Sequence, residues 1–199
     1  MDGKEKERLT KAREALKEDL PLNDAQWERF AEGLVIRKYD KGDIIIRAGE
    51  VESYLSIVLE GVTRHYVINR HGDDISFEFS FPLEFNSSYA SFLSRNPSRF
   101  FIEAMDPTVL ASMPHSYLME LYRKYPERSM ASKSAIENYY IWREKREISL
   151  LTETAMDRYS NLIKRSPEYL ENVPLKHLAS YLNIRPESLS RIRREWRKN

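Results

Sequence analysis

Residues 174–199 read PLKHLASYLNIRPESLSRIRREWRKN, and this stretch contains two runs of apolar residues at helical spacing. In the first run, apolar residues recur at i, i+3, i+4 and i+7, which places them on one side of a two-turn helix. In the second run, at about 100° per residue, they lie within about 60° of one another. The stretch therefore predicts two short helices that pack together through these apolar sides. The apolar residues are Leu175, Leu178, Ala179 and Leu182 in the first run and Leu189, Ile192 and Trp196 in the second.

The connection between these two helices has the residues of a sharp turn. Asn183 tolerates the left-handed backbone conformation that a helix-to-helix turn requires. Arg185 precedes a proline and is therefore pushed toward extended geometry, while Pro186 suits the first position of the next helix. Two short helices joined in this way are typical of a helix-turn-helix, and we expect one here.

The second helix also has a charged side. Its residues lie about 180° from the apolar side, so they must project outward. In the major groove of DNA, arginine bonds guanine O6 and N7, and glutamate accepts from cytosine N4. We therefore expect this side to read double-stranded DNA, with four further residues near phosphates. The outward residues are Glu187, Arg191, Arg194 and Lys198, and those near phosphates are Lys176, His177, Arg185 and Ser188.

An ordinary solvated helix face is the alternative interpretation, because most runs of charge have no partner. The distribution of charge favours DNA. The whole chain has a formal net charge of +1, but residues 158–199 hold 10 Lys and Arg against 4 Asp and Glu. The remaining 157 residues hold 22 Lys and Arg against 27 Asp and Glu. A basic end on an acidic body is typical of a protein with a nucleic-acid-binding module.

From Val35 the sequence changes to short runs of β-branched and aromatic residues separated by turn residues. Gly42, Gly49, Gly61 and Gly72 stand at these breaks, where a positive φ costs glycine least. Breaks about every ten residues favour a closed or rolled antiparallel barrel over a parallel sheet. The expected strands lie within VIRKY (35–39), IIIRAGE (44–50), SYLSIVLEG (53–61), TRHYVI (63–68), ISFEFSF (75–81), 100–104 and 108–113.

Helices are expected on both sides of this β region. Residues 127–151 contain neither glycine nor proline and predict one long helix. Ile141, Ile148 and Ala155 recur every seven residues through its second half and just after it, and Leu151 completes the stripe, as at a dimer interface. Polar residues occupy the other positions of the same seam. The pattern leaves open whether this helix pairs with a second copy or packs on its own barrel. Shorter helices are expected over 4–19, 24–34 and 155–165, and the polar seam residues are Ser134, Glu137 and Glu144.

These elements predict an α+β chain of three parts. Residues 1–126 would form N-terminal helices and an antiparallel, jelly-roll-like β-roll, and residues 127–153 a long connecting or dimerisation helix. Residues 154–199 would form the helix-turn-helix domain, which ends without the β-wing that often follows such a motif.

Several classes of function are excluded. The chain has no cysteine, which removes disulfides, thiolate metal sites and cysteine nucleophiles. The four histidines form no His-x-His pair, and no Walker loop, GxSxG elbow or Rossmann glycine pattern occurs. Asp73-Asp74 beside Gly72 is typical of a turn and not of a catalytic pair. We therefore expect no catalytic residues, no metal and no cofactor. The charged N-terminal segment and the lack of about 18 consecutive apolar residues predict a cytoplasmic protein without a membrane partner.

The chain resembles the CRP/FNR family of transcription regulators over nearly its whole length. YDKGDIIIRAGE followed by LSIVLEG resembles the early strands of that family's cyclic-nucleotide-binding β-roll, and HLASYLNIRPESLSRIRR resembles its helix-turn-helix. The resemblance implies a homodimer whose recognition helices lie about 34 Å apart, with RNA polymerase as a candidate further partner. Glu187 and Arg191 fall on positions that the family uses to read bases, whereas Pro186 replaces a base-reading arginine. A β-roll signalling module that binds a ligand or protein without reading DNA is the alternative.

The resemblance also implies the position of an effector pocket. The family's cyclic-nucleotide site needs a glycine and a carboxylate for the ribose, and an Arg-Ser pair ten residues later for the phosphate. Here those positions are Ser87, Ser88, Ser98 and Arg99, and none of the four matches. No glycine follows Gly72, so a loop drawn tightly around a phosphate lacks its usual residue. We therefore expect a degenerate pocket that does not bind cAMP, and an effector of unknown identity.

Overall fold

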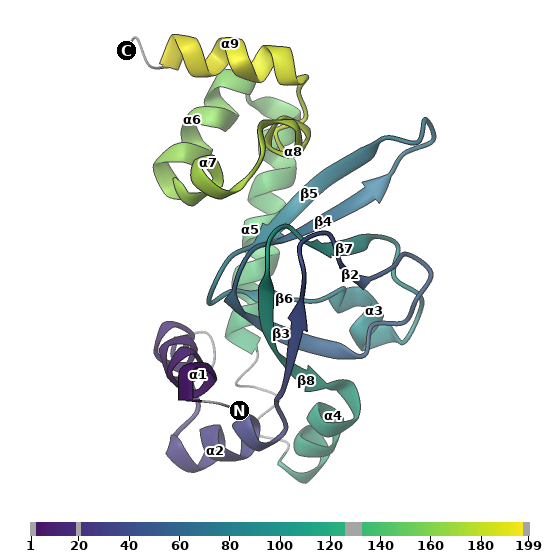
Figure 1. The fold of residues 1–199 in the computed structure, drawn as a ribbon, viewed down its shortest axis with the longest axis vertical. Helices are drawn as coiled ribbons and strands as arrows, with labels where there is room; N and C mark the ends of the chain where they lie inside the picture. The colour runs from purple at the N-terminus through teal and green to yellow at the C-terminus, as the bar shows by residue number, and fades with distance from the viewer. Residues whose placement is uncertain (1–2, 19–20, 126–132, 197–199) are drawn as a thin grey trace. The chain divides into compact units, whose positions relative to one another are not determined.

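The computed structural model describes residues 3–18, 21–125 and 133–196 and is drawn in Figure 1. Contacts divide the chain into two compact units. The first comprises Met1–His65 and Phe79–Asn138, and the second comprises Tyr66–Glu78 and Tyr139–Asn199. The division passes through two strands and one helix, so the outer half of a β-hairpin belongs to the same unit as the C-terminal helices.

Eight strands in the described ranges form two four-stranded sheets. The strand orders are β1-β8-β3-β6 and β2-β7-β4-β5, and β1 pairs with β8 in antiparallel register from Val35↔Ser112 to Tyr39↔Thr108. The antiparallel β-roll expected from the sequence is therefore confirmed. The strands are β1 (Val35–Tyr39), β2 (Ile44–Ile46), β3 (Tyr54–Glu60), β4 (Thr63–Ile68), β5 (Asp74–Ser80), β6 (Phe85–Asn86), β7 (Phe101–Ala104) and β8 (Thr108–Pro114).

The second strand is shorter than expected. β2 ends at Ile46 because a turn follows: the Arg47 N–H donates to Glu50 Oε2 (2.9 Å), and Gly49 has a φ of +94°. Three elements of the first unit, which are strand β6 and helices α3 (Tyr89–Ser94) and α4 (His115–Lys124), were not expected. Strand β6 and helix α3 have two and six residues, which is too few for a periodic pattern to identify them.

The core of the first unit joins the sheet to helices that precede and follow the roll in the sequence. Leu9 of α1 (Gly3–Ala15) and Trp27 of α2 (Asp24–Glu32) are buried together with Ile57 of β3 and Leu118 of α4. The start of α2 is fixed by a capping box, in which the side chains of Asn23 and Gln26 each accept from the other's backbone N–H (2.9 Å). Asn23 is therefore the N-cap of α2, and apolar burial places both helices on the roll.

Gly61 lies between β3 and β4 at a point where the backbone of the β7–β8 turn comes very close. Its φ is +84°, and a Cβ at this position would lie 2.5 Å from Thr108 Oγ1 and 2.6 Å from the Pro107 carbonyl. The neighbouring Val62 N–H donates to Asp106 Oδ1 (2.7 Å), which holds the two turns together. A side chain at residue 61 would therefore meet both a left-handed backbone and a fixed neighbour.

Gly61→Ala is expected to destabilise the first unit by more than its backbone conformation alone requires. The matched control is Gly42→Ala, because Gly42 has a φ of +88° with no atom within 4 Å of the added Cβ. We expect Gly42→Ala to cost about 1–2 kcal/mol, and Gly61→Ala to cost about 2 kcal/mol more, a typical cost of steric overpacking. Urea unfolding followed by circular dichroism measures both, and equal losses would contradict the close approach.

In the second unit, the described residues form four short helices after the long one. Its core includes Tyr159, Leu162, Leu178 and Leu189, all buried. Helix α7 was not expected, because five residues between Pro167 and Pro174 show no helical period. The long helix predicted over 127–151 is described only from Lys133, since residues 127–132 lie outside the described ranges. The helices are α5 (Lys133–Thr152), α6 (Ala155–Arg165), α7 (Glu168–Asn172), α8 (Leu175–Tyr181) and α9 (Pro186–Trp196).

Candidate DNA interface and effector pocket

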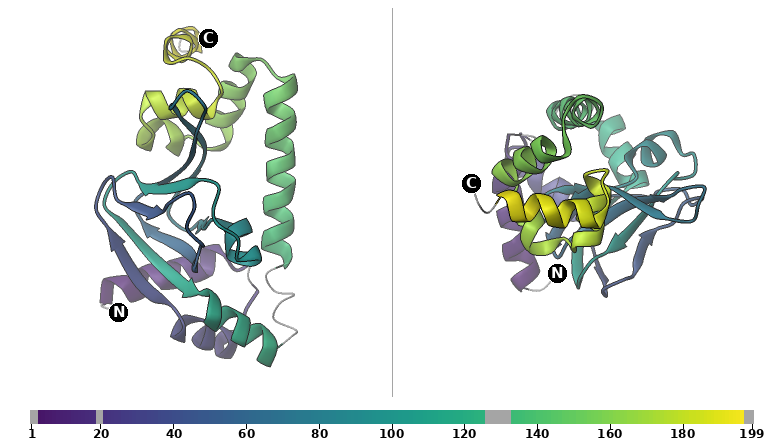
Figure 2. Two further views of the ribbon diagram at one scale, coloured as in Figure 1. Left: turned by 90° about the vertical axis from the view of Figure 1, so that its right-hand side faces the viewer. Right: turned by 90° about the horizontal axis from the view of Figure 1, so that it is seen from above.

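Helices α8 and α9 are joined by a turn of the kind the sequence predicts. Asn183 has a φ of +55°, the Ile184 N–H donates to the Ala179 carbonyl (3.0 Å), and the Asn183 N–H donates to the Ser180 carbonyl (2.9 Å). These two bonds form a Schellman motif, which ends α8 and redirects the chain. Helix α9 then crosses α8, as the views in Figures 1 and 2 show. The structure thus has two crossed helices joined by a left-handed residue.

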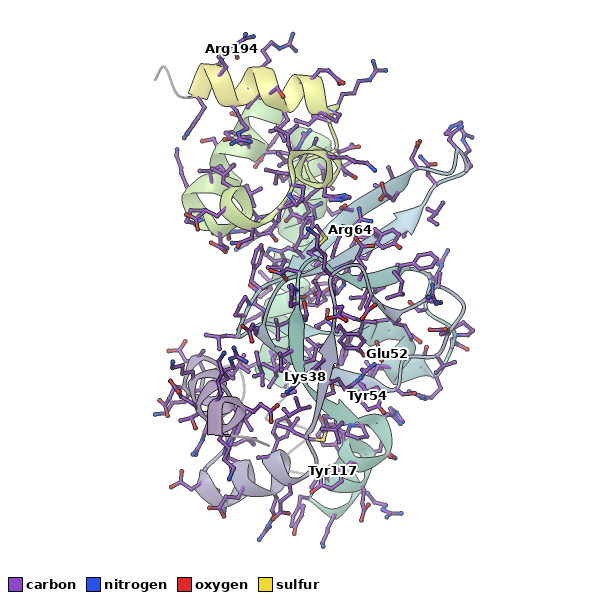
Figure 3. The ribbon with its side chains drawn as sticks, viewed as in Figure 1. Lys38, Glu52, Tyr54, Arg64, Tyr117 and Arg194 are labelled. Carbon is purple, nitrogen blue, oxygen red and sulfur yellow. The ribbon has the colours of Figure 1, made fainter. Side chains whose placement is uncertain are left out.

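The apolar and charged sides of α9 separate as expected. Leu189 and Ile192 are 0% and 7% exposed, and the Trp196 ring meets Tyr159 edge-on at 6.1 Å between centroids. Glu187, Arg191 and Arg194 are exposed, and Figure 3 shows Arg194 on the side of α9 away from α8. The burial of one side therefore leaves the other free for a partner.

The remaining candidate DNA contacts are exposed, partly buried or outside the described residues. Arg185 and Lys176 are exposed, while Ser188 and His177 are partly buried. Lys198 falls outside the described residues. In the second unit, Lys176 also forms an ion pair with Asp74 of β5 at 3.4 Å, which a turn interpretation of Asp73-Asp74 did not predict.

A groove of about 510 Å³ opens beside the charged side and is lined by Leu175, Ser190, Arg193 and Arg194. Neither Ser190 nor Arg193 was among the candidate residues. Arg193 lies only about 40° from Leu189 at 100° per residue, which makes it a flank residue and not an outward one. The positive charge of Arg193 was the one feature of the sequence that could have marked it as a candidate DNA contact. The groove therefore adds Ser190 and Arg193 as residues that a phosphate could contact.

Two arginines hold the C-terminal end of α8. Arg146 of α5 donates to the Tyr181 carbonyl (2.8 Å) and lies 3.8 Å from the centroid of the Tyr181 ring. Arg158 of α6 donates to the carbonyls of Leu182 (3.1 Å) and Glu153 (2.6 Å). Burial lowers the pKa of Arg146, yet its guanidinium remains a cation at neutral pH because the ordinary pKa of arginine is far above neutral. These contacts satisfy the last carbonyls of α8 and favour its helix dipole.

Arg146→Met is expected to destabilise the second unit by about 1–3 kcal/mol, because it retains apolar volume but removes a charged donor from a carbonyl. Lys145→Met is the matched control, since Lys145 is exposed on the same helix. Thermal unfolding monitored by circular dichroism compares the two variants with the unsubstituted protein. Equal stability of both variants would show that the contact with Tyr181 contributes nothing.

The effector-pocket positions are brought together only in part. Ser88 donates to Ser98 Oγ (2.8 Å), and both side chains are buried. Ser98 accepts from the Phe100 N–H (3.3 Å) and also donates to the Phe100 carbonyl (2.8 Å), while Ser87 donates to the Tyr54 carbonyl (2.9 Å). Arg99 is exposed instead. The three serines therefore bond to the protein itself.

A buried carboxylate that was not among the candidates lies at the centre of this region. Glu52 Oε1 accepts from the backbone N–H groups of Ser53 and Tyr54 (both 2.9 Å), and Oε2 accepts from that of Ser88 (3.3 Å). Figure 3 shows Glu52 beside Tyr54. Burial raises the pKa of Glu52, and the bonds from Tyr54 and Ser88 oppose that rise. The backbone N–H of Ser88, one of the predicted pocket positions, is thus already bonded to a carboxylate of this chain.

The loop that follows also closes on itself. Arg95 has a φ of +59°, a left-handed conformation in the segment that has no glycine. Its guanidinium donates to the carbonyls of Glu52 (2.5 Å) and Phe92 (3.2 Å), and Ser91 accepts from the Glu52 N–H (3.0 Å). Arg95 therefore adopts a left-handed conformation in which asparagine is more common, and the hydrogen bonds of its own guanidinium hold it there.

The part of the chain that the structure describes contains neither a candidate metal site nor a candidate membrane span. Among the described residues, no group of three or more His, Asp or Glu lies together in a way that could hold a metal ion. No helix in the described ranges combines the length and the apolar character needed to cross a bilayer.

Comparison with known proteins identifies the region from β1 to the end of α4. The sequence profile of the cyclic nucleotide-binding domain matches residues 36–125. The chain contains that domain. A comparison with curated protein sequences finds no match.

Solved structures show the fold of the rest of the chain. FixK2 from Bradyrhizobium japonicum is 17% identical with a TM-score of 0.73, and the match covers 83% of this chain and 85% of FixK2. CooA from Carboxydothermus hydrogenoformans is 13% identical with a TM-score of 0.69, covering 92% and 84%. The c-di-GMP responsive regulator CLP from Xanthomonas campestris is 15% identical with a TM-score of 0.67, covering 88% and 92%. The chain therefore has the fold of the CRP/FNR regulators, which confirms the resemblance in fold.

Proposed function

We propose that this chain is a DNA-binding transcription regulator of the CRP/FNR type. The observation that supports this most directly is the exposed side of α9, where Glu187, Arg191 and Arg194 project from a helix whose other side is buried. Arg191 and Glu187 would contact base edges in the major groove, and Lys176, Arg185 and Ser188 would contact phosphates. The fold shared with regulators agrees with this assignment.

The proposed regulator acts as a homodimer through α5. In the described part of that helix no residue is buried, and Ile141, Ile148 and Leu151 are 49%, 52% and 80% exposed. Ile141 and Ile148 are seven residues apart and Leu151 follows three later, and exposed apolar residues at this heptad spacing favour pairing with a second copy of the same helix. The two-fold symmetry of such a dimer would place the two α9 helices on successive turns of DNA. RNA polymerase is a further partner that such a regulator would contact.

The β-roll of the proposed regulator senses an effector other than cAMP. The Ser87, Ser88 and Ser98 hydroxyls already bond to the protein, and Glu52 occupies the Ser88 N–H. A cyclic phosphate would have to displace these bonds and approach a buried carboxylate, whose charge repels it. The signal would pass along α5, which is one continuous helix with residues in both compact units.

Selection of bound sequences from random duplexes is the experiment that tests DNA reading and dimer symmetry together. We expect a palindromic consensus, with two half-sites about one helical turn apart, roughly 34 Å. Affinity for that consensus should fall by orders of magnitude between low and moderate salt, because binding releases counterions from several phosphates. Binding that is absent, or present without sequence preference at any salt, would favour a β-roll module that does not read DNA.

Two substitutions are expected to separate base contacts from phosphate contacts. Arg191→Ala should cost about 1–3 kcal/mol on the consensus and relax the preference at one position, as loss of a base contact does. Lys176→Ala should weaken binding to all sequences alike and reduce the salt slope by about 1. Lys11→Ala, which removes an exposed cation from α1, is the control. Fluorescence anisotropy measures all three, and an unchanged consensus in Arg191→Ala would contradict its role.

The protein is expected to show no functional affinity for cAMP, because Ser88 and Ser98 at the pocket positions already bond to each other, and Ser88 also bonds to Glu52. Isothermal titration calorimetry of the full chain measures this directly, and a micromolar dissociation constant would contradict it. Arg99→Ala serves as a second check. Since the Arg99 side chain is exposed, whereas those of Ser88 and Ser98 are buried, its removal should leave any weak heat signal unchanged.

A further inference from the structure

We propose that the outer β4–β5 hairpin is a latch that competes with DNA for Lys176 on the first helix of the helix-turn-helix. This inference rests on the proposed DNA binding and adds a regulatory contact within the second compact unit. Asp74, Ser76, Lys176 and Ser180 form this contact, and all four belong to that unit.

Strand β5 is the edge strand of its sheet, so one side of its backbone lacks a neighbouring strand. The Ser76 N–H on β5 donates to Ser180 Oγ of α8 (2.9 Å). Two residues earlier, Asp74 Oδ1 lies 3.4 Å from Lys176 Nζ. Lys176 and Ser180 are four residues apart and therefore lie on the same side of α8. The strand edge and this side of the helix thus meet at two successive points.

A third contact ties the same hairpin to the connecting helix. Tyr139 of α5 donates to Glu78 Oε2 (2.8 Å), and Arg143 donates to the Tyr139 hydroxyl (3.2 Å). Burial raises the pKa of Tyr139, so its hydroxyl keeps its proton and remains a donor. Asp74, Ser76 and Glu78 alternate along β5, and one strand therefore holds both α8 and α5.

The contact with Asp74 conflicts with DNA binding. Lys176 cannot neutralise a phosphate fully while it is paired with a carboxylate, and Asp74 would itself repel the phosphate. Bound DNA therefore favours the state in which the hairpin has left α8. Strands β4 and β5 continue into the first unit through Thr63–His65 and Phe79–Ser80. A change in the β-roll can thus reach α8 through two continuous strands.

The expected effect is modest, because the Lys176 side chain is 70% exposed and the Asp74 side chain is 28% exposed. Exposed ion pairs contribute little, so Asp74→Asn should tighten DNA binding by about two- to fivefold. Asp73→Asn is the matched control. It removes the same charge one residue away, where Asp73 bonds only within the hairpin turn to Asn69 (3.1 Å).

The test is a cycle of DNA affinities, measured by fluorescence anisotropy on the full chain with a selected consensus duplex. Asp74→Asn should bind more tightly than Asp73→Asn, and the difference should vanish in a Lys176→Ala background, because the effect runs through Lys176. Equal affinities for Asp74→Asn and Asp73→Asn, with unsubstituted protein that binds DNA, would overturn the latch alone. Failure of every variant to bind DNA would reject the proposed function and the competition with it.

A measurement without DNA tests whether the contact exists. The Ser76 amide hydrogen should exchange slowly in the unsubstituted protein and at least about tenfold faster in Ser180→Ala, which removes its acceptor. Ser190→Ala is the control, because Ser190 is an exposed serine of α9. Fast exchange at Ser76 in the unsubstituted protein would overturn the latch whatever the DNA experiments show.

Discussion

The burial of Leu189 and Ile192 against the preceding helices is the constraint on which the rest of the second unit depends. At 3.6 residues per turn, a helix that buries these two residues must expose Glu187 and Arg191. The Schellman turn at Asn183 sets where α9 begins, and Arg146 and Arg158 fix the end of α8 from which that turn starts. The orientation of the charged side is thus a consequence of packing, and no separate interaction is needed to aim it.

Features with a local cause could be predicted from the sequence. The turn at Asn183 needs a residue that tolerates positive φ, and the strands of the roll stand out as runs of β-branched and aromatic residues between turn residues. Glu52 could not be recognised, because a single carboxylate has no pattern and its partner Ser88 lies 36 residues away. The neighbours of Asp74 predict a turn, whereas its ion pair joins it to Lys176, which is far away in the sequence. Arg146 and Arg158 were missed for the same reason.

The pocket region shows how a binding site can close without losing its fold. Residues 36–125 retain the profile of a cyclic nucleotide-binding domain, yet Arg95 adopts the left-handed turn that glycine would make at no steric cost. The energy needed to hold an arginine in this conformation is offset by its bonds to the Glu52 and Phe92 carbonyls. Opening the loop for a ligand would break those bonds and leave buried polar groups without partners, which is costly. A ligand that used this pocket would need compensating donors of its own.

If DNA and the hairpin compete for Lys176, the two events are thermodynamically linked. DNA binding must weaken the contact between β5 and α8 by the same factor by which that contact weakens DNA binding. An effector could then act from a distance from the helix-turn-helix, provided that it binds one arrangement of strands β4 and β5 more tightly than the other. Its influence on DNA affinity through this route is bounded by the strength of the latch. A weak ion pair and one hydrogen bond permit graded adjustment, and a larger switch would have to come from the pairing and orientation of α5.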